Sequence, residues 1–577
     1  MARANDQVAA VLQEYAELIT ILGGDRFRAR SYQRAARAVA GYHADVAALG
    51  RDGVRTIPGV GASIADKIDE ILKTGTFRRL EELRAKVPPS VLQLSAIPTV
   101  GTKRAMVLYR ELGVTSVAEL LDAIEAGRLR DLRGFGPKSE ENIRAGVELL
   151  QRSGNRIRLD VAWGLAERIV AALSAVPGCQ RCAYAGSLRR GRETVGDIDV
   201  LAATEEPAAL MEAFVGLPEM GDVLARGEKK TSVRTSTGIQ VDLRVVPVES
   251  WGAALQYFTG SQEHNVRVRE IAVQAGLKLS EYGLFDAENR PVAAGTEQEV
   301  YSRLGMDWVP PPLREDAGEV AAAREGRLPR LVQLTDLRGD LHTHTNLTDG
   351  LASLEEMVAA AAARGYEYYA VTDHAPKLAM HRMTLDKARA QREQLTRLAA
   401  GSGMRLLHGT ELNIDPDGEV DWPAEILAEF DICVASVHSH FTLPVEQQTR
   451  RVIRACENPH VHVIGHLTGR LIGRRPPIDL DFEAVFKAAA RTGTALEING
   501  GPERLDLRDD HIRWAARHGV HFVISSDAHA VPQLDNVRYA TLTAQRGWLT
   551  PDQIINTWPY QRLRKFLSAS ERRVHQG

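Results

Sequence analysis

The sequence is poor in cysteine, carries almost no net charge and contains no long hydrophobic run. Four cysteines in 577 residues are too few for a fold held together by disulfides, and they fit a reducing compartment. No stretch approaches the roughly 18 apolar residues that span a bilayer, and the N-terminus lacks a secretory pattern. A net charge of −3 excludes a uniformly basic coat for nucleic acid. We therefore expect a cytoplasmic protein with no membrane partner, and its length implies about two to four domains.

Three segments in the first quarter of the chain repeat one pattern, TIPGVG, AIPTVG and DLRGFG, and each is followed by a helical stretch. Glycine lets the backbone turn sharply, and the next helix N-terminus offers free N–H groups to a phosphate. A plain turn between helices would explain one copy, whereas three copies favour binding to the DNA backbone. The middle copy has Thr99 in place of the first glycine. The candidate DNA-binding residues are Gly59, Gly61, Gly101, Gly134 and Gly136.

Three aspartates on predicted strands form a first candidate metal site. Asp197 and Asp199 in GDIDVL are two residues apart, so they point to the same face of a strand, and Asp242 in VDLR lies on another strand. Oxygen ligands suit Mg²⁺, and two such ions stabilise the attacking and leaving oxygens of phosphoryl transfer. A solvated strand end would explain the D-x-D pattern alone. The upstream GSLRRG adds Ser187 and Arg190, which are donors suited to a triphosphate.

The last 240 or so residues contain a second candidate site of a different chemical kind. Short apolar strands alternate with alanine-rich helices, which indicates βα units and a parallel sheet or barrel. Nearly every strand ends in a ligand-type residue, where barrel enzymes carry their chemistry. The first two histidines are expected on one face of a strand. Imidazole with carboxylate suits Zn²⁺, Mn²⁺ or Fe²⁺. The candidates are His342, His344, Asp349, His374, Glu411, His438, His466, Asp527 and His529.

The aspartate motifs, followed by YFTGSQEHNVRVREIA, resemble the family X DNA polymerases. By this resemblance Tyr257 and Phe258 screen the sugar, while Asn265 and Arg269 contact the nascent base pair. Gln240 departs from the arginine of well-studied eukaryotic members, so the orientation of the third aspartate must differ. The implied nucleotide-binding set is Gly186, Ser187, Arg190, Gly196, Tyr257, Phe258, Gly260, Ser261, Asn265 and Arg269.

One lysine of the N-terminal region matches a catalytic position of the same family. Lys67, in ADKIDEIL, aligns with the lysine that forms a Schiff base with abasic sugars. A neighbouring phosphate-binding lysine of the family is replaced by Ser63. The alternative is an exposed helical lysine that contacts a DNA phosphate.

The histidine-rich set resembles the PHP (polymerase and histidinol phosphatase) family, whose barrel holds three metal ions. Every ligand position is filled by a metal-binding side chain, including Asp349, where some members use histidine. A degenerate, structural domain would have lost several of these ligands. The complete set therefore predicts an active hydrolase with up to three Zn²⁺, Mn²⁺ or Fe²⁺ ions.

Together the resemblances describe the bacterial family X DNA polymerases with a C-terminal PHP domain. They imply a multidomain α+β and α/β protein with helix-hairpin-helix N-terminal domains, a nucleotidyltransferase palm with a mixed β-sheet, and a distorted TIM-like barrel. The expected domains are a lyase-like helical domain (1–85), fingers (86–155), palm (156–255), thumb (256–316), linker (317–334) and PHP domain (335–577).

The implied activity is gap filling in DNA repair, with base excision as the leading setting, and 3′→5′ exonuclease action by the PHP domain. Abasic-site endonuclease and 3′-phosphatase activities are further candidates for that domain. The palm is expected to bind two Mg²⁺ or Mn²⁺ ions. Expected partners are gapped or nicked duplex DNA and dNTPs, with other repair proteins as candidates, for a monomer associated with the nucleoid. A small-molecule phosphatase on a DNA-binding arm and a non-catalytic repair scaffold remain open as rivals.

Overall fold

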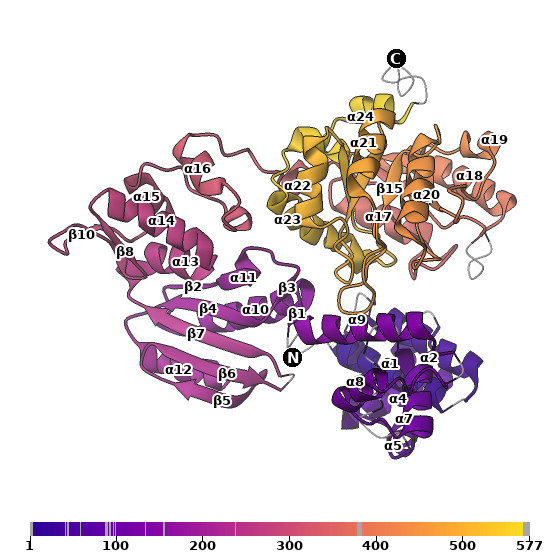
Figure 1. The fold of residues 1–577 in the computed structure, drawn as a ribbon, viewed down its shortest axis with the longest axis horizontal. Helices are drawn as coiled ribbons and strands as arrows, with labels where there is room; N and C mark the ends of the chain where they lie inside the picture. The colour runs from indigo at the N-terminus through magenta and orange to yellow at the C-terminus, as the bar shows by residue number, and fades with distance from the viewer. Residues whose placement is uncertain are drawn as a thin grey trace.

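The computed structural model describes residues 4–22, 24–40, 42, 45–57, 59–86, 91, 94–95, 97, 100–132, 134–153, 156–236, 238–377 and 383–568. Figure 1 shows a helical N-terminal unit, a lobe that contains the β1-β3, β10-β9-β8 and β2-β4-β7-β6-β5 sheets, and a C-terminal lobe built around a parallel sheet. All four cysteines are free thiols. Among the described residues, no helix combines the length and apolar character that crossing a membrane requires.

The N-terminal unit is all helical and has one hydrophobic core. The hairpins share one turn, because the N–H groups of Val60, Val100 and Phe135 each donate to the carbonyl three residues earlier. Gly59 and Gly134 have φ of 81° and 89°, a conformation that favours glycine. Thr99 lies outside the described residues. The helices are α1 (Ala4–Ile21), α2 (Arg26–Ala40), α3 (Val46–Val54), α4 (Ala62–Thr74), α5 (Arg78–Arg84), α7 (Gly101–Leu112), α8 (Val117–Glu125) and α9 (Pro137–Ser153).

A five-stranded mixed sheet forms the centre of the next unit. Its strand order is β2-β4-β7-β6-β5, and β4 and β7 are its parallel pair. The apolar sides of α10 and α12 join the core of this sheet. The elements are β1 (Ile157–Arg158), α10 (Leu159–Ser174), β2 (Arg181–Tyr184), α11 (Gly186–Arg189), β3 (Thr194–Val195), β4 (Asp197–Ala203), α12 (Pro207–Val215), β5 (Met220–Arg226), β6 (Lys230–Thr235) and β7 (Gln240–Val246). The predicted mixed sheet is confirmed.

The following helices and a three-stranded sheet have their own core. Residues 317–334, expected as a linker, contain α16 (Glu319–Arg324), and Ala323 and Leu331 join that core. The buried Glu319 carboxylate lies 2.6 Å from His264 Nδ1, which ties the segment to α14. The other elements are η1 (Val248–Ser250), α13 (Trp251–Thr259), α14 (Gln262–Gln274), β8 (Lys278–Ser280), β9 (Gly283–Phe285), β10 (Pro291–Ala293), α15 (Glu297–Arg303) and η2 (Pro311–Leu313).

The C-terminal lobe is a parallel barrel in which seven strands, β11 to β17, pair in chain order. Just beyond the first and last strands, Asp527 N–H donates to the His342 carbonyl and His344 N–H to that of Ala528, so the barrel closes. The predicted TIM-like fold is confirmed. The strands are β11 (Gly339–Asp340), β12 (Tyr368–Val371), β13 (Arg405–Asn413), β14 (Ile432–Ser436), β15 (Val463–Gly465), β16 (Ala495–Asn499) and β17 (Phe522–Ser525).

Helices surround this barrel, as the alternating sequence pattern predicts. The expected placement of His342 and His344 on a strand differs from the structure, because β11 ends at Asp340. Hydrogen bonds to residues 527–528 fix the histidine segment instead. The helices are η3 (Leu334–Asp336), α17 (Leu354–Ala363), α18 (Leu385–Ser402), α19 (Ala424–Leu427), α20 (Val445–Glu457), α21 (Phe482–Thr492), α22 (Asp509–Arg517), η4 (Val531–Asn536), α23 (Val537–Arg546), η5 (Pro551–Gln553), η6 (Ile555–Thr557) and α24 (Tyr560–Leu567).

The barrel packs directly against the mixed-sheet unit. Leu505, in the loop after β16, and Tyr539 of α23 are buried in the core of that unit. Arg546, at the end of α23, has a side chain only 5% exposed. Its guanidinium donates to Asp509 (2.8 Å), Glu315 (2.9 Å) and the carbonyl of Arg190 (2.9 Å). One buried cation therefore joins three units of the chain.

Replacing Arg546 with methionine should destabilise this junction, because Asp509 and Glu315 lose a shared buried cation. Loss of one partner from a buried ion pair costs about 3 kcal/mol. Thermal unfolding should begin at a lower temperature, and amide exchange should accelerate in residues 186–192 and 537–546.

The matched control is Arg491→Met, which removes an exposed pair with Glu457 and should cost less than about 1 kcal/mol. Equal effects of the two substitutions would contradict the assigned role of Arg546.

Two candidate metal centres

The three aspartates meet because β4 and β7 are parallel neighbours. In the register of this pair Asp199 lies opposite Asp242, and Asp197 lies opposite Gln240. One carboxylate oxygen from each aspartate falls within 4.8 Å of the others. Gly186 has φ of 61°, and a Cβ there would overlap the Asp199 carboxylate. The start of GSLRRG therefore approaches the acidic site as closely as only glycine permits.

The pKa values of Asp199 and Asp242 are shifted in opposite directions. Burial, together with the nearby Asp197 and Asp242, raises the pKa of Asp199 to about 6. Burial would also raise the pKa of Asp242, but hydrogen bonds from Lys230, Ser232 and Gln240 hold it below its usual value. Lys230 Nζ lies 2.6 Å from Asp242 Oδ2, and the Gln240 amide donates to Oδ1 at 3.1 Å. A lysine and an amide thus orient Asp242.

Arg190 is engaged by protein groups in this structure. Its guanidinium donates to the Thr259 carbonyl (2.6 Å) and to Glu315 (3.0 Å), and the side chain is 13% exposed. Ser187 lies on α11 beside it, and Gly196 connects β3 to β4 just before Asp197. Any phosphate bound by Arg190 has to compete with the Glu315 carboxylate.

The YFTGS segment ends α13 and begins α14. The rings of Tyr257 and Phe258 meet edge to face at 5.1 Å. Gly260 has φ of 67°, and the Ser261 hydroxyl caps α14 by accepting from the His264 N–H. The expected base-pair contacts lie together on α14. Asn265 is buried and donates to the Tyr257 carbonyl at 2.7 Å, and Arg269 donates to the Asn265 carbonyl at 3.3 Å.

All nine candidate ligands of the barrel gather at the carboxyl ends of its strands, around Glu411. Its Oε2 lies 2.9 Å from His374 Nδ1, and its Oε1 lies 3.1 Å from His438 Nε2 and 3.0 Å from His466 Nε2. His342 and His344 approach the same carboxylate at 3.5 Å. A single buried carboxylate surrounded by imidazoles suits a ligand shared between cations.

Three overlapping groups of side chains could each hold an ion. Buried ring nitrogens make no hydrogen bond in this pocket, namely Nε2 of His342 and both nitrogens of His344. Since burying such nitrogens unpaired is costly, a bound cation fits them. The groups are His344, Asp349, His374 and His529; His342, His344 and Asp527; and His374, Glu411 and His438.

Nearby carboxylates favour positive charge on some of the imidazoles. Burial would lower the pKa of His374, but Glu411 and Asp349 raise it to about 10. Asp349 and Asp527 likewise raise the pKa of His529 to about 9 against the effect of burial. The pocket therefore stabilises cations, and a metal has to displace protons to enter it.

Comparisons with known proteins agree with this arrangement. The chain is 34% identical over 569 residues to the DNA polymerase/3′-5′ exonuclease PolX of Bacillus subtilis, covering 98% of this chain and 99% of that protein. This chain belongs to the family X DNA polymerases that carry a C-terminal PHP domain. Family models match at residues 3–77 (Helix-hairpin-helix domain), 91–148 (SAM-like Helix-hairpin-helix tandem), 254–315 (DNA polymerase beta thumb) and 340–500 (PHP domain).

Two further relatives each match only a part of this family X polymerase. DNA polymerase lambda of Rattus norvegicus is 30% identical over 323 residues, which cover 51% of this chain and 53% of that protein. A probable phosphatase of Syntrophotalea carbinolica is 33% identical over 230 residues, which cover 38% of this chain and 90% of that protein. The second match is thus to a protein of little more than the barrel's length.

Several residues that contact the candidate ligands of this family X polymerase are not predicted from the sequence. Glu497 accepts from the backbone N–H of His466 and lies 2.6 Å from His342 Nδ1, which fixes that ring. Its signal in the sequence is a charged residue inside the apolar strand ALEING. Lys230 has no comparable signal. Arg470, four residues after His466, pairs with Glu193 at 2.6 Å across the barrel junction.

Glu497→Gln should weaken metal binding in the barrel by about 10- to 100-fold, because it removes the charge that orients and polarises His342. Mn²⁺ titration followed by calorimetry would measure the change.

Glu367→Gln is the control, since that exposed carboxylate pairs with Arg338 on the barrel surface. Unchanged Mn²⁺ affinity in the Glu497 variant would show that the His342 orientation does not depend on this carboxylate.

Proposed function

We propose that this chain is a DNA-directed DNA polymerase that fills short gaps during repair, with base excision as its setting. Its barrel acts as a metal-dependent 3′→5′ exonuclease. Full-length similarity to a protein named DNA polymerase/3′-5′ exonuclease supports this assignment. The observation that carries it is the presence of two complete ligand sets on one chain. A relic scaffold would have no reason to retain both.

In the palm, Asp197, Asp199 and Asp242 would hold two Mg²⁺ or Mn²⁺ ions. When bound, the ions supply positive charge that stabilises the charge developing on phosphate oxygens. Asp242 would accept the proton of the primer 3′-hydroxyl as that oxygen attacks the α-phosphate and pyrophosphate leaves. Lys230 and Gln240 hold the Asp242 carboxylate in place for this transfer.

Nucleotide contacts would come from the two loops beside the aspartates. Ser187 and Arg190 would bind the β- and γ-phosphates, and the close approach at Gly186 brings their loop to the metal ligands. Tyr257 and Phe258 would exclude a 2′-hydroxyl. Asn265 and Arg269 would contact the nascent pair from α14. Gly260, Ser261 and Gly196 would shape the surrounding turns.

In the barrel, the nine-residue set would hold up to three Zn²⁺, Mn²⁺ or Fe²⁺ ions. When bound, these ions lower the pKa of a coordinated water and neutralise phosphate charge. Glu497 and Asn499 would keep His342 and Asp527 in position, since the Asn499 amide donates to both carboxylates. Similarity to a probable phosphatase favours 3′-phosphatase activity as a second reaction of this site, beside abasic-site cleavage.

The proposed partners are gapped or nicked duplex DNA and dNTPs, with other repair proteins as candidates, for a cytoplasmic, nucleoid-associated monomer. Gly59, Gly61, Gly101, Gly134 and Gly136 would hold the DNA backbone through the hairpins. The proposed division is a lyase-like domain (1–85), fingers (86–155), palm (156–255), thumb (256–316), a connecting segment (317–334) and the PHP domain (335–577).

The two activities should separate by substitution. Asp197→Ala with Asp199→Ala should abolish extension of a labelled primer on gapped duplex but retain its shortening without dNTPs. His342→Ala with His344→Ala should do the reverse. Loss of both activities from either variant, in protein with the wild-type thermal midpoint, would contradict two independent centres.

Lys67 is the proposed nucleophile for removal of a 5′-deoxyribose phosphate. Its ammonium lies 5.8 Å from the centre of the Tyr32 ring and 6.0 Å from that of Phe77, which holds it over two aromatic faces. Borohydride should trap a covalent adduct with incised abasic DNA in the wild type but not in Lys67→Ala.

Lys73→Ala is the matched control, because Lys73 is an exposed lysine of the same helix that pairs with Asp69. An adduct that persists in the Lys67 variant would assign the chemistry to another amine.

A further inference from the structure

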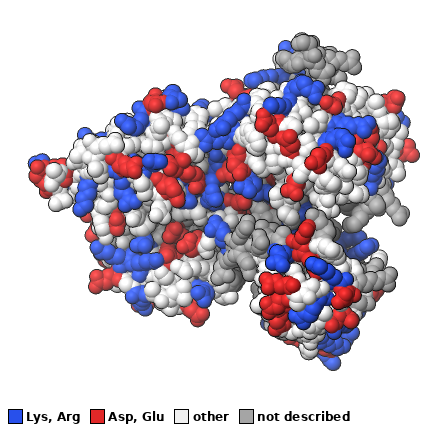
Figure 2. All heavy atoms as spheres, in the orientation of Figure 1, with Lys and Arg blue, Asp and Glu red and all other residues white. Residues whose placement is uncertain are grey.

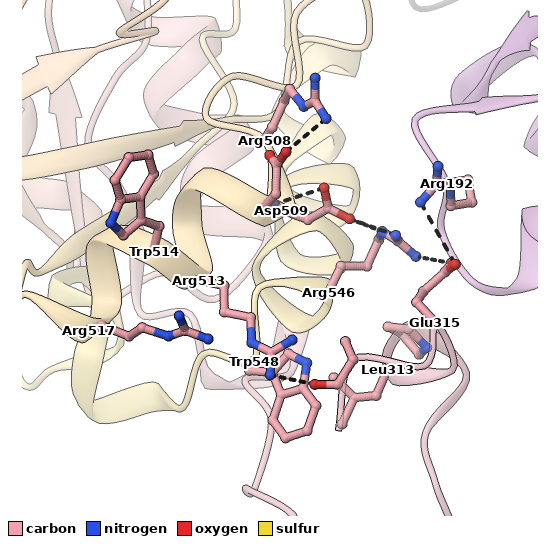
Figure 3. Close-up of a pocket in the computed structure, with 13 residues that line it drawn as sticks. Arg192, Leu313, Glu315, Arg508, Asp509, Arg513, Trp514, Arg517, Arg546 and Trp548 are labelled. Carbon is pink, nitrogen blue, oxygen red and sulfur yellow. Dashed lines mark hydrogen bonds and ion pairs between the residues drawn. The ribbon is translucent and has the colours of Figure 1, made fainter. Parts of the chain in front are cut away.

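A pocket of about 320 Å³ lies where the thumb and palm meet the barrel (Figure 3). None of the proposed metal ligands lines it. We call it the junction pocket. Its walls are α22, Arg546 and Trp548 of the barrel, residues between Pro312 and Ala317 of the thumb, and Arg192 of the palm. Figure 2 shows positively charged side chains gathered along this boundary between the lobes.

The charges of the junction pocket do not cancel. Five arginines line it against three carboxylates, and each carboxylate is already paired. Glu315 and Asp509 bind Arg546, and Asp510 accepts from Arg508 at 2.9 Å. The Arg517 side chain has neither an ion pair nor a hydrogen bond within the part of the chain that the structure describes. The arginines are Arg192, Arg508, Arg513, Arg517 and Arg546.

Helix α22 presents an aromatic residue together with these cations. Arg517 follows Arg513 by four positions and Trp514 by three, so its side chain neighbours both of them on the helix surface. Trp514 is 38% exposed, and its ring packs edge-on against Phe486 at 5.5 Å. The Arg513 guanidinium lies over the Trp548 ring at 4.6 Å, so it is already held in place.

An exposed indole beside the unpaired guanidinium of Arg517 matches the chemistry of a nucleotide. The base can stack on the indole while the phosphate pairs with arginine, as in many sites for single-stranded nucleic acid. The volume is within the range of small-ligand pockets and has room for about one such unit.

We propose that the junction pocket binds a nucleotide of single-stranded DNA, with its base on Trp514 and its phosphate on Arg517. A strand is favoured over a free nucleotide because two pocket residues are close in sequence to segments beside the metal centres. Arg192 follows the Arg190 loop of the palm. Arg508 follows Arg504, whose Nε lies 3.8 Å from Asp527 Oδ2 in the barrel. This inference rests on the proposed function, since only an enzyme that extends and shortens one strand needs such a site.

The test is binding of a short fluorescent oligothymidylate to the full-length protein, followed by anisotropy in EDTA to prevent cleavage. Arg517→Gln and Trp514→Leu should each weaken binding about tenfold. Arg517→Gln should also reduce the slope of log affinity against log salt by about 0.7, because one phosphate contact is lost. Primer extension on gapped duplex and the thermal midpoint should stay unchanged.

The matched control is Arg564→Gln, which alters an exposed arginine of α24 with no ion pair among the described residues. Wild-type affinity and salt slope in the Arg517 variant would overturn the proposal. Displacement of the oligomer by dTMP at equal nucleotide concentration would overturn its assignment to a strand. Failure of the wild type to extend a gapped primer would instead contradict the proposed function, which the EDTA binding measurement does not test.

Discussion

Parallel pairing of neighbouring strands is the constraint on which both centres depend. The carboxyl ends of parallel strands lie at the same edge of a sheet. Side chains from distant parts of the sequence therefore meet there. In the palm, one parallel pair inside an otherwise antiparallel sheet places Asp199 opposite Asp242. In the barrel, seven parallel strands do the same for nine candidate ligands, and closure between residues 342–344 and 527–528 completes the ring.

The sequence predicts those residues of the two centres whose position follows from spacing along a single strand. Two aspartates separated by one residue must share a strand face, and a histidine after an apolar run must lie at a strand end. The fold follows similarly, because alternation of strand and helix implies a parallel sheet. The histidine pair itself lies just beyond β11, which is too short to carry it. A strand ends where its hydrogen bonds to neighbouring strands end, and the local sequence pattern does not predict that point.

The residues that escaped prediction act across long sequence separations. Lys230 reaches Asp242 from an antiparallel strand, and Glu497 reaches His342 from β16, 155 residues later in the chain. The type of Lys230 is ordinary for a strand residue, and the charge of Glu497 inside an apolar strand does not reveal which side chain it contacts. Arg470 likewise finds its partner far away in the sequence, because its guanidinium donates to Glu193 across the contact between the two lobes.

In both centres, neighbouring groups of the protein compensate the charges of side chains that lie close together. In the palm, the ammonium of Lys230 compensates Asp242, while burial and its neighbours raise the pKa of Asp199 to about 6. In the barrel, the carboxylates raise the pKa of His374 and His529, so protons balance the charge there. The junction follows the same rule, because Glu315 lies between Arg190 and Arg546. If a triphosphate draws Arg190 away, Arg546 still pairs with Glu315, so this half-buried carboxylate keeps a cation and the lobes stay joined.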